Sequence, residues 1–400
     1  MAGSTSSGPA VEELRVATVS VIIPAYNQGR FLGEALDSAL GQTHQDFEVV
    51  VVDDGSTDET PDVVRSRSDR RIHYLYQDNQ GLAAARNTGI RESAGAWLSF
   101  LDADDAFLPE KLSSLLALAQ AHPEAGLAAG QAIPVDEDGR PTGAVFDRGA
   151  PEEPEDWLLG NPLHVGSVIL NRAWQEAVGW FDVSLRSYED WDLWLRLALA
   201  GCPMLWLPQP VSLYRFHRGQ MIRDGRRMTE ANLAVLDKVF RRPDLPESWK
   251  ANRRRAYSRA QLRAAANAYG ANDVEAGKAA LLQAVDQDPS LLHDGGRPLR
   301  DIFFAWGDSP KTTDRMRYLQ HLHDNLPGSL RPYLSKRDLA EGVLRVGLEA
   351  FQRGDRQTAR AALWRGIQLD PRRLRNRGLV SMLVRCLAPV ARRAPAKGVS

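Results

Sequence analysis

Short apolar runs that end in polar turns alternate with helical patterns along the first hundred residues. In the first helical stretch, Phe31 to Leu40, apolar residues recur three and four positions apart, as on the buried face of an amphipathic helix. Four such pairs of strand and helix predict a parallel α/β sheet with right-handed crossovers. The predicted strands are 18–24, 47–52, 72–76 and 97–101.

The fourth run, Trp97 to Leu101, stops abruptly in three carboxylates, Asp102, Asp104 and Asp105. Ligands of open α/β sheets bind beyond the carboxyl ends of the strands. Carboxylates gathered there repel one another unless a cation or several donors offset their charge. The segment therefore predicts a binding site for a divalent metal ion that is bound to a diphosphate. The alternative interpretation is an acidic loop that caps a helix starting near Pro109.

Beyond the fourth strand, the pattern predicts further strands on both sides of a loop rich in Glu, Asp, Pro and Gly. One run, Leu197 to Tyr214, carries no charge and is long enough to suggest a membrane span. Its Gly201 and its three prolines break a helix, so a loop and a buried strand are favoured. The predicted segments are strand 127–135, loop 136–156, strand 165–170, helix 171–178 and strand-like 213–218.

Several side chains near the predicted strand ends could hold a nucleotide. Neither G-x-x-x-x-G-K nor G-x-G-x-x-G follows a strand, so the phosphates would need other partners. Tyr26 offers a ring for stacking, Asp54 an acceptor for a base or ribose, and Arg86 a cation for phosphate. Taken singly, each could instead be a packing residue, a turn former or a solvated helix charge. Together they favour a ligand site.

A second acidic pair, Glu189 and Asp190, precedes a helical pattern that starts at Trp191. Acidic residues are common at helix starts because of the helix macrodipole. The same environment keeps a carboxylate ionised, as a general base for a hydroxyl group requires, so the two interpretations are compatible. Trp191 and Trp194 share the apolar face and are expected in the core. His217 could ligate a metal or a diphosphate, although a lone histidine is more often structural.

From about residue 248 onwards the periodicity is wholly helical. A weak internal repeat places a turn and an Ala-rich helix 82 residues apart, at Asn272-Asp273 and at Gly354-Asp355. The pattern resembles tetratricopeptide-type hairpins, although two copies are fewer than a stable array needs. A helical accessory domain without a repeat function is the alternative. Either form could dock on the first half of the chain or bind a partner protein.

Composition narrows the class of protein. A chain of 400 residues with 43% hydrophobic and 25% charged residues suits a water-soluble protein of two or three domains. The net charge of -1 argues against a general nucleic-acid binder. Cys202 and Cys386 are the only cysteines and lie far apart, which excludes a disulfide framework and fits a reducing cytoplasm.

The two ends of the chain differ in character. The first sixteen residues lack the apolar segment of a signal peptide and are predicted to be disordered. From Pro371 to the end there are eight basic residues and no acidic one. This end is predicted either to lie on an anionic membrane as a helix or to remain a solvated tail.

Five motifs in a fixed order resemble those of inverting family 2 glycosyltransferases. They are VSVIIPAYN (19–27), VVDDGSTD (51–58), GLAAARNTG (81–89), LDADD (101–105) and EDWDLWLR (189–196). The resemblance covers about residues 17–225. Five separated motifs in the right order are far more specific than an isolated D-x-D.

The resemblance implies a GT-A fold and a role for each matched residue in binding a nucleotide-sugar donor. Tyr26 would stack on the base, Asp54 would bond to it, and Arg86 would lie near the nucleotide. Pro24, in the first motif, and Ala103, in the fourth, would be further contacts to the donor.

The remaining matched residues are implied to hold the metal and to carry the chemistry. Asp102 would contact the ribose or the water shell of the metal, and Asp104 would bind Mn²⁺ or Mg²⁺. His217 would assist the metal or the diphosphate. Asp190 would be the base that takes the proton of the acceptor hydroxyl. These roles imply a single displacement that inverts configuration at the anomeric carbon.

The predicted organisation is a disordered tail (1–16), an α/β GT-A domain (17–245), an all-α tetratricopeptide-like domain (246–378) and a basic tail (379–400). We expect transfer from a nucleotide sugar, with UDP favoured, to a saccharide or glycoconjugate acceptor in polysaccharide synthesis. The expected location is the cytoplasm, with peripheral contact to the inner face of the membrane.

Two other classes of protein stay open. One is a catalytically silent GT-A scaffold that acts through its helical domain. The other is a nucleotidyltransferase, which would need a glycine-rich basic loop after the first strand. There, residues 25–30 supply only Gly29 and Arg30.

Overall fold

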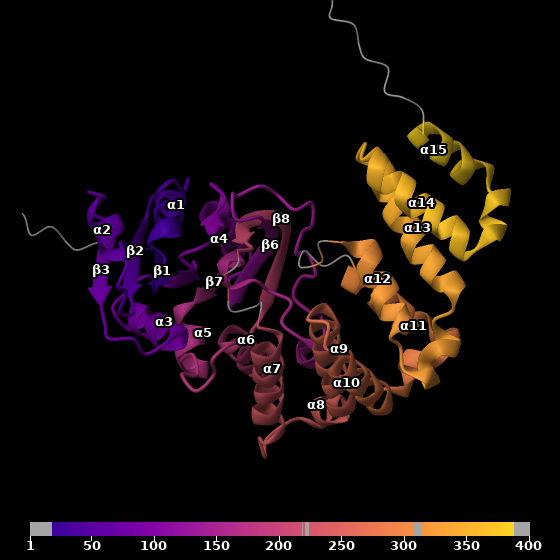
Figure 1. Ribbon diagram of the computed structural model, residues 1–400. Helices are drawn as coiled ribbons and strands as arrows, with labels where there is room; N and C mark the ends of the chain where they lie inside the picture. Colours follow the sequence, from indigo (N-terminus) through magenta and orange to yellow (C-terminus); the bar gives the residue numbers. More distant parts are fainter. Residues whose placement is uncertain (1–17, 218, 221–223, 308–311, 313, 388–400) are drawn as a thin grey trace, which may run out of the picture. The chain divides into compact units, whose positions relative to one another are not determined.

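The computed structural model describes residues 18–217, 219–220, 224–307, 312 and 314–387. The predicted N-terminal tail and most of the predicted basic tail lie outside these residues. The chain forms two compact units that divide between Asn252 and Arg253, and each is described by itself (Figure 1). The short helix α8 (Glu247–Ala251) belongs to the first unit, where its Trp249 is buried.

An eight-stranded sheet with the order β3-β2-β1-β4-β7-β6-β8-β5 forms the centre of the first unit. The strands β3, β2, β1 and β4 are parallel, as are β6 and β8, whereas β7 is antiparallel to both of its neighbours. The predicted parallel arrangement is confirmed for the first four strands, whereas β5, like β7, pairs antiparallel. The strands are β1 (Val19–Ala25), β2 (Phe47–Asp53), β3 (Ile72–Tyr76), β4 (Trp97–Phe100), β5 (Ala106–Phe107), β6 (Leu127–Val135), β7 (Val168–Asn171) and β8 (Met204–Arg215).

Apolar runs in the central strands are explained by helices on both faces of the sheet. Every residue of β1 is buried. Val49 and Val51 of β2 belong to the core that α1 (Gly29–Leu40) and α4 (Lys111–Ala121) cover. Val50 points to the other face and packs against Ala85 of α3 (Leu82–Arg91). A strand covered on both sides cannot show alternation, so its sequence reads as continuously apolar.

Four further helices belong to the first unit, and one of them carries two tryptophans of the core. Trp191 and Trp194 are both fully buried, which confirms the core position predicted for them. The indole N–H of Trp191 donates to the carbonyl oxygen of Trp157 at 2.9 Å. These helices are α2 (Thr60–Arg65), α5 (Arg172–Val178), α6 (Glu189–Leu199) and α7 (Gly225–Phe240).

The polar stretch between β6 and β7 is an ordered connection in the described structure. It folds back on β6 through bridges that Phe146 makes with Ala132 and that Pro141 makes with Val135. Two short 3-10 helices follow, η1 (Pro154–Leu159) and η2 (Val165–Ser167). The strand predicted from residue 165 therefore starts later, at Val168.

The second unit is built from helices, as its sequence periodicity predicts. The internal repeat corresponds to α10 and α14, which have 14 residues each. Before each helix, Asn272 or Gly354 adopts a positive φ, and then Asp273 or Asp355 accepts a hydrogen bond from the helix N-terminus. The helices are α9 (Arg253–Gly270), α10 (Val274–Gln287), α11 (His293–Gly307), α12 (Arg315–Asp324), α13 (Lys336–Gln352), α14 (Arg356–Leu369) and α15 (Arg377–Leu387).

The start of the predicted basic tail is part of the folded second unit. Leu379 and Cys386 of α15 are buried and belong to one apolar cluster with Leu363 of α14. This packing shows a docked helix up to Leu387, where a solvated tail was one of the two predictions. Within the described ranges of the chain, every helix is too short or too polar to cross a bilayer.

Candidate active site

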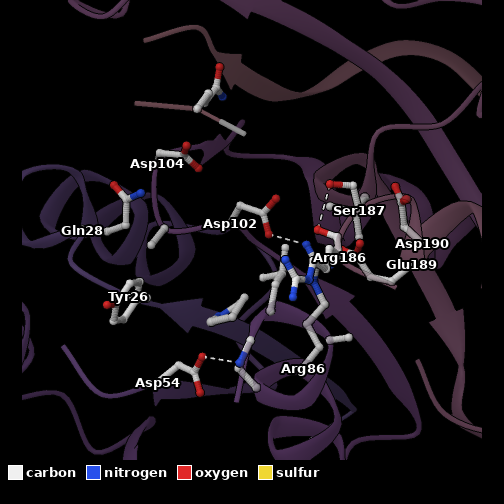
Figure 2. A pocket seen from close by; sticks show the side chains of 18 of the residues that line it. Tyr26, Gln28, Asp54, Arg86, Asp102, Asp104, Arg186, Ser187, Glu189 and Asp190 are labelled. Carbon is white, nitrogen blue, oxygen red and sulfur yellow. Dashed lines mark hydrogen bonds and ion pairs between the residues drawn. The ribbon is translucent and has the colours of Figure 1, made fainter. Parts of the chain in front are cut away.

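A pocket of about 1290 Å³ opens where β1, β2 and β4 end. Figure 2 shows its side chains, with Tyr26 and Asp54 toward one end and Asp190 toward the other. Every residue predicted to act in binding or catalysis lines this pocket. They are Pro24, Tyr26, Asp54, Arg86, Asp102, Ala103, Asp104, Asp190 and His217.

One end of the pocket combines an exposed ring with a fixed carboxylate. Tyr26 follows β1 and is 50% exposed. Asp54 is buried, and its Oδ1 accepts hydrogen bonds from the side chain of Gln77 at 2.6 Å and from the backbone N–H of Gln80 at 2.9 Å. Its Oδ2 accepts from the N–H of Gly81 at 2.8 Å. These donors hold the Asp54 carboxylate rigidly beside the open face of Tyr26.

The three carboxylates after β4 each have a different cationic or imidazole partner. The helix that follows them begins only at Lys111. Its N-cap is Glu110, which makes no side-chain capping hydrogen bond, so none of the three carboxylates caps this helix, in contrast to the alternative interpretation. The partners are Arg86 for Asp102, His217 for Asp104 and His164 for Asp105.

Arg86 lies under the middle of the pocket and joins its two halves. Its guanidinium donates to Asp102 Oδ1 at 2.5 Å and to Glu189 Oε1, and the residue is 1% exposed. Burial alone would lower the pKa of Arg86, but the charges of Asp102 and Glu189 outweigh it and raise that pKa. The side chain that was predicted as a phosphate contact is thus engaged by two carboxylates.

Asp104 is held both by its side chain and by its backbone. Its Oδ2 lies 2.9 Å from Nε2 of His217, which is buried beside the ring of Phe31. Its carbonyl oxygen accepts from Nε of Arg215 at 2.8 Å. A carboxylate oxygen and an imidazole nitrogen therefore converge on one point at the rim of the pocket.

Asp105, the next residue, is buried and has partners of its own. Its Oδ1 accepts from the backbone N–H of Arg215 at 2.8 Å, and its Oδ2 lies 3.1 Å from Nε2 of His164. Burial raises the pKa of Asp105 to about 7, against the opposing effect of His164. The His164 ring stacks on Tyr214 with centroids 4.5 Å apart. None of these contacts was predicted from the sequence.

Asp190 stands at the start of α6, at the end of the pocket opposite Tyr26 (Figure 2). Its Oδ1 accepts from the N–H of Trp191 at 2.7 Å, and its Oδ2 accepts from Nδ2 of Asn161 at 2.8 Å. Burial, and then the neighbouring charge of Glu189, raise the pKa of Asp190 to about 6. A carboxylate of this basicity is suited to accept a proton near neutral pH.

The residue before this acidic pair has an unusual backbone. Tyr188 has φ 61° and ψ 22°, a left-handed conformation that costs energy in a residue with a side chain. It places Glu189 and Asp190 in the first turn of α6, where one faces Arg86 and the other faces Asn161. Strain of this kind is typical of functional sites.

The pocket also contains residues that the sequence analysis missed. Asn161 and His164 come from the stretch before β7, where no periodic pattern or motif marked them. A polar residue on each side of Pro162-Leu163, just ahead of an apolar strand, is the one local signal that could have drawn attention to them.

The donor set at the pocket rim fits a divalent cation that is shared with a substrate. Asp104 and His217 supply one oxygen and one nitrogen that already converge at 2.9 Å. Within the part of the chain that the structure describes, no three His, Cys, Asp or Glu side chains gather closely enough to form a complete metal site. Mg²⁺ and its analogues are often held by one or two protein ligands together with substrate phosphates and water.

Comparison with known proteins assigns the chain to a family. The family model for Glycosyl transferase family 2 matches residues 20–158. The putative teichuronic acid biosynthesis glycosyltransferase TuaG of Bacillus subtilis (strain 168) is 30% identical over 203 residues, which cover 49% of this chain and 78% of TuaG. The chain therefore belongs to the family 2 glycosyltransferases.

Other similar proteins differ in length or only share the fold. An uncharacterized glycosyltransferase of Rickettsia bellii (strain RML369-C) is 46% identical over 100 residues, which are 25% of this chain but only 14% of that protein. The mannosyltransferase PcManGT of Pyrobaculum calidifontis, solved with GDP-Man and Mn²⁺, has a TM-score of 0.50 and 20% identity. That alignment covers 78% of this chain and 88% of PcManGT, and it supports the GT-A fold.

Proposed function

We propose that this protein is a metal-dependent inverting glycosyltransferase that moves a sugar from a nucleoside-diphosphate donor to a hydroxyl group of an acceptor. The observation that carries the proposal is the convergence on one pocket of a partly buried base, Asp190, and a metal pair, Asp104 and His217. Tyr26 and Asp54 complete the same pocket at the far end.

The donor would lie along the ends of β1, β2 and β4. Tyr26 would stack on the base and Asp54 would accept a hydrogen bond from it, while Pro24 and Ala103, which also line the pocket, would be further contacts to the donor. Asp102 would contact the ribose or the water shell of the metal. A divalent cation at Asp104 and His217, Mn²⁺ or Mg²⁺, would stabilise the charge that develops on the departing diphosphate. PcManGT, which shares the fold, was captured with GDP-Man and Mn²⁺.

Asp190 would carry the chemical step on the acceptor side. Its carboxylate would take the proton of the acceptor hydroxyl as the oxygen attacks the anomeric carbon from the side opposite the diphosphate. The C–O bond to the diphosphate breaks as the new bond forms, so configuration at that carbon inverts. Asn161 and the N–H of Trp191 stabilise the ionised form of Asp190 before the reaction.

The acceptor would be a saccharide or glycoconjugate, and UDP remains the favoured nucleotide. The helical second unit would contribute to acceptor or partner binding. The proposed location is the cytoplasm, with peripheral contact to the inner face of the membrane.

The donor site is tested by binding. We expect thermal stabilisation and calorimetric binding with one class among UDP-, GDP- and TDP-sugars, dependent on Mn²⁺ or Mg²⁺. Asp104→Ala should weaken this binding by about 10- to 100-fold, because it removes one of the two protein ligands. Metal-independent binding of unchanged affinity in the variant would contradict the proposed metal pair.

The chemical role is tested by a variant that preserves the donor site. Asp190→Asn keeps the shape of the side chain but cannot accept the proton, so donor affinity should be unchanged while transfer falls by about 10²- to 10⁴-fold. Retained transfer would exclude Asp190 as the base. Donor binding without transfer to any acceptor in the wild-type protein would favour a silent scaffold.

A further inference from the structure

A four-residue segment, Asn161 to His164, touches both ends of the catalytic machinery. It lies between η1 and η2 and contributes to the wall of the pocket. At its start, Asn161 meets Asp190, and at its end His164 meets Asp105, the neighbour of the metal-binding candidate Asp104.

The orientation of the Asn161 amide follows from its contacts. Its Oδ1 accepts a hydrogen bond from the backbone N–H of Leu163 at 3.3 Å, so its Nδ2 is directed outward. That Nδ2 donates to Oδ2 of Asp190 at 2.8 Å. Because the other carboxylate oxygen is taken by the N–H of Trp191, the plane of the Asp190 carboxylate is fixed by two donors.

His164 contacts the segment that carries Asp102, Asp104 and Asp105 through the last of these residues. Its Nε2 lies 3.1 Å from Oδ2 of Asp105, whose side chain is fully buried. Since Asp105 also accepts the N–H of Arg215, it links the segment to the end of β8. The His164 ring is confined on one face by Tyr214 at a centroid distance of 4.5 Å. The imidazole of His164 thus contacts the side chain of Asp105, the residue that directly follows Asp104.

The segment itself is anchored on both sides. Leu163 and Val165 are 3% and 4% exposed. The hydroxyl and the N–H of Ser167 donate to the carbonyl oxygen of His164 at 2.7 and 2.9 Å. A Cβ at Gly166 would lie 2.6 Å from Nε2 of His164, so a glycine is needed for the ring to take this position.

We propose that Asn161 to His164 is a positioning segment that sets the base and the metal-binding carboxylate loop relative to each other. Asn161 aligns Asp190 toward the acceptor, and His164 holds Asp105 and thereby the backbone of Asp104. This inference rests on the proposed function, because it assigns these residues to the same reaction.

Hydrogen bonding by Asn161 has a second consequence for Asp190. An N–H donor favours the ionised carboxylate and counteracts burial and the repulsion from Glu189. The other charged or titratable groups that face Asp190 are Arg86 on α3, His164 on the segment itself and Tyr214 on β8. Loss of the amide should therefore move the titration of the base upward.

The first experiment replaces Asn161 and measures transfer as a function of pH. Asn161→Ala is expected to lower kcat by about 10- to 100-fold with donor affinity within about twofold. The acid limb of kcat should shift upward by about one pH unit, which a loss of fold stability would not cause. Asn252→Ala, which removes an amide that donates to the backbone of Ser248 in α8, is the matched control and should leave all three quantities unchanged.

The second experiment separates the role of His164. His164→Leu is expected to weaken Mn²⁺-dependent binding of the donor by about tenfold, measured by calorimetry without turnover. His164→Gln keeps a polar side chain beside Asp105 and should restore part of the affinity. Gly166→Ala keeps the imidazole but displaces it, and it should weaken donor binding even if His164→Leu does not fold.

The outcomes distinguish the inference from the proposed function. An unshifted acid limb in Asn161→Ala, or unchanged donor affinity in both His164→Leu and Gly166→Ala, would overturn the positioning role. If the wild-type protein binds no nucleotide sugar and transfers none, the proposed function fails first, and with it the inference. Wild-type turnover with insensitive variants would overturn the inference alone.

Discussion

At the scale of single residues, Arg86 shows what an enclosed charge requires. Its guanidinium stays protonated, so burial is tolerable only because Asp102 and Glu189 supply opposite charge on two sides. Removing one carboxylate from such a buried group typically costs about 3–5 kcal/mol. Arg86 is therefore a structural connection between the donor side and α6, in addition to any contact it makes with a ligand.

The raised pKa of Asp190 leads to a pH dependence of transfer. The base must be ionised, so kcat should rise with pH through an apparent pKa of about 6 and level off above it. A pH profile of kcat at saturating donor and acceptor measures this value. A profile already flat from pH 4.5 upward would contradict the burial of the base.

Asp190 also makes the free energy of unfolding depend on pH, and this free energy falls with rising pH whereas kcat rises. Folding raises the pKa of Asp190 from 3.8 to about 6, so the folded state binds the proton more tightly than the unfolded state. Its contribution to the free energy of unfolding is therefore present at low pH and is lost as pH rises through about 6. Asp190→Asn should lack this dependence, which chemical denaturation between pH 4 and pH 8 would show.

At the scale of elements, the sequence predicted best those segments whose own pattern decides their structure. The buried strands β1 and β2 and the amphipathic α1 follow directly from apolar runs and helical spacing. The direction of β7 could not be predicted, because an apolar run reads the same in parallel and antiparallel pairing. The two-residue β5 is too short to carry a pattern, and it exists through its pairing with β8.

The residues of the candidate site were likewise predicted where a local pattern marks them and missed where none does. Asp102, Asp104 and Asp190 stand beside recognisable strand and helix ends, whereas Asn161 and His164 act from an irregular connection. Their importance depends on tertiary contacts with Asp190 and Asp105, which local sequence does not encode.

The helices α13 and α14 pack closely, and a substitution at their contact tests how much this packing contributes to stability. A Cβ at Gly366 would lie 2.4 Å from Cγ of Leu344. Gly366→Ala should therefore lower the unfolding free energy by about 1–2 kcal/mol, since overpacking outweighs the gain in helix propensity. Denaturant titration measures the change.

Gly270 at the end of α9 is the matched control for that substitution. A Cβ there would meet nothing within 4 Å, so Gly270→Ala should be neutral or stabilising by up to about 1 kcal/mol. Equal effects of the two substitutions would show that close approach of α13 and α14 does not limit stability.

At the scale of the whole molecule, the first unit extends beyond the segment that the family model matches. Residues 20–158 contain β1 to β6 but lack β7, which separates β4 from β6 in the sheet. They also lack Glu189, one of the two carboxylates on Arg86. We expect residues 18–158 alone to be unfolded or aggregated, and residues 18–252 to unfold cooperatively, as circular dichroism during heating would show. A cooperative transition in the shorter fragment would contradict this prediction.

The sheet order also bears on how the nascent chain acquires its structure. The strands β3, β2, β1 and β4 can pair once the first hundred residues have left the ribosome, because all four lie within that length. In contrast, β5 and β6 must wait for β7 and β8, whose residues 168–215 are synthesised much later. Phe107 and Leu127 therefore stay uncovered by these strands during translation, which makes this stage the one most in need of chaperone protection.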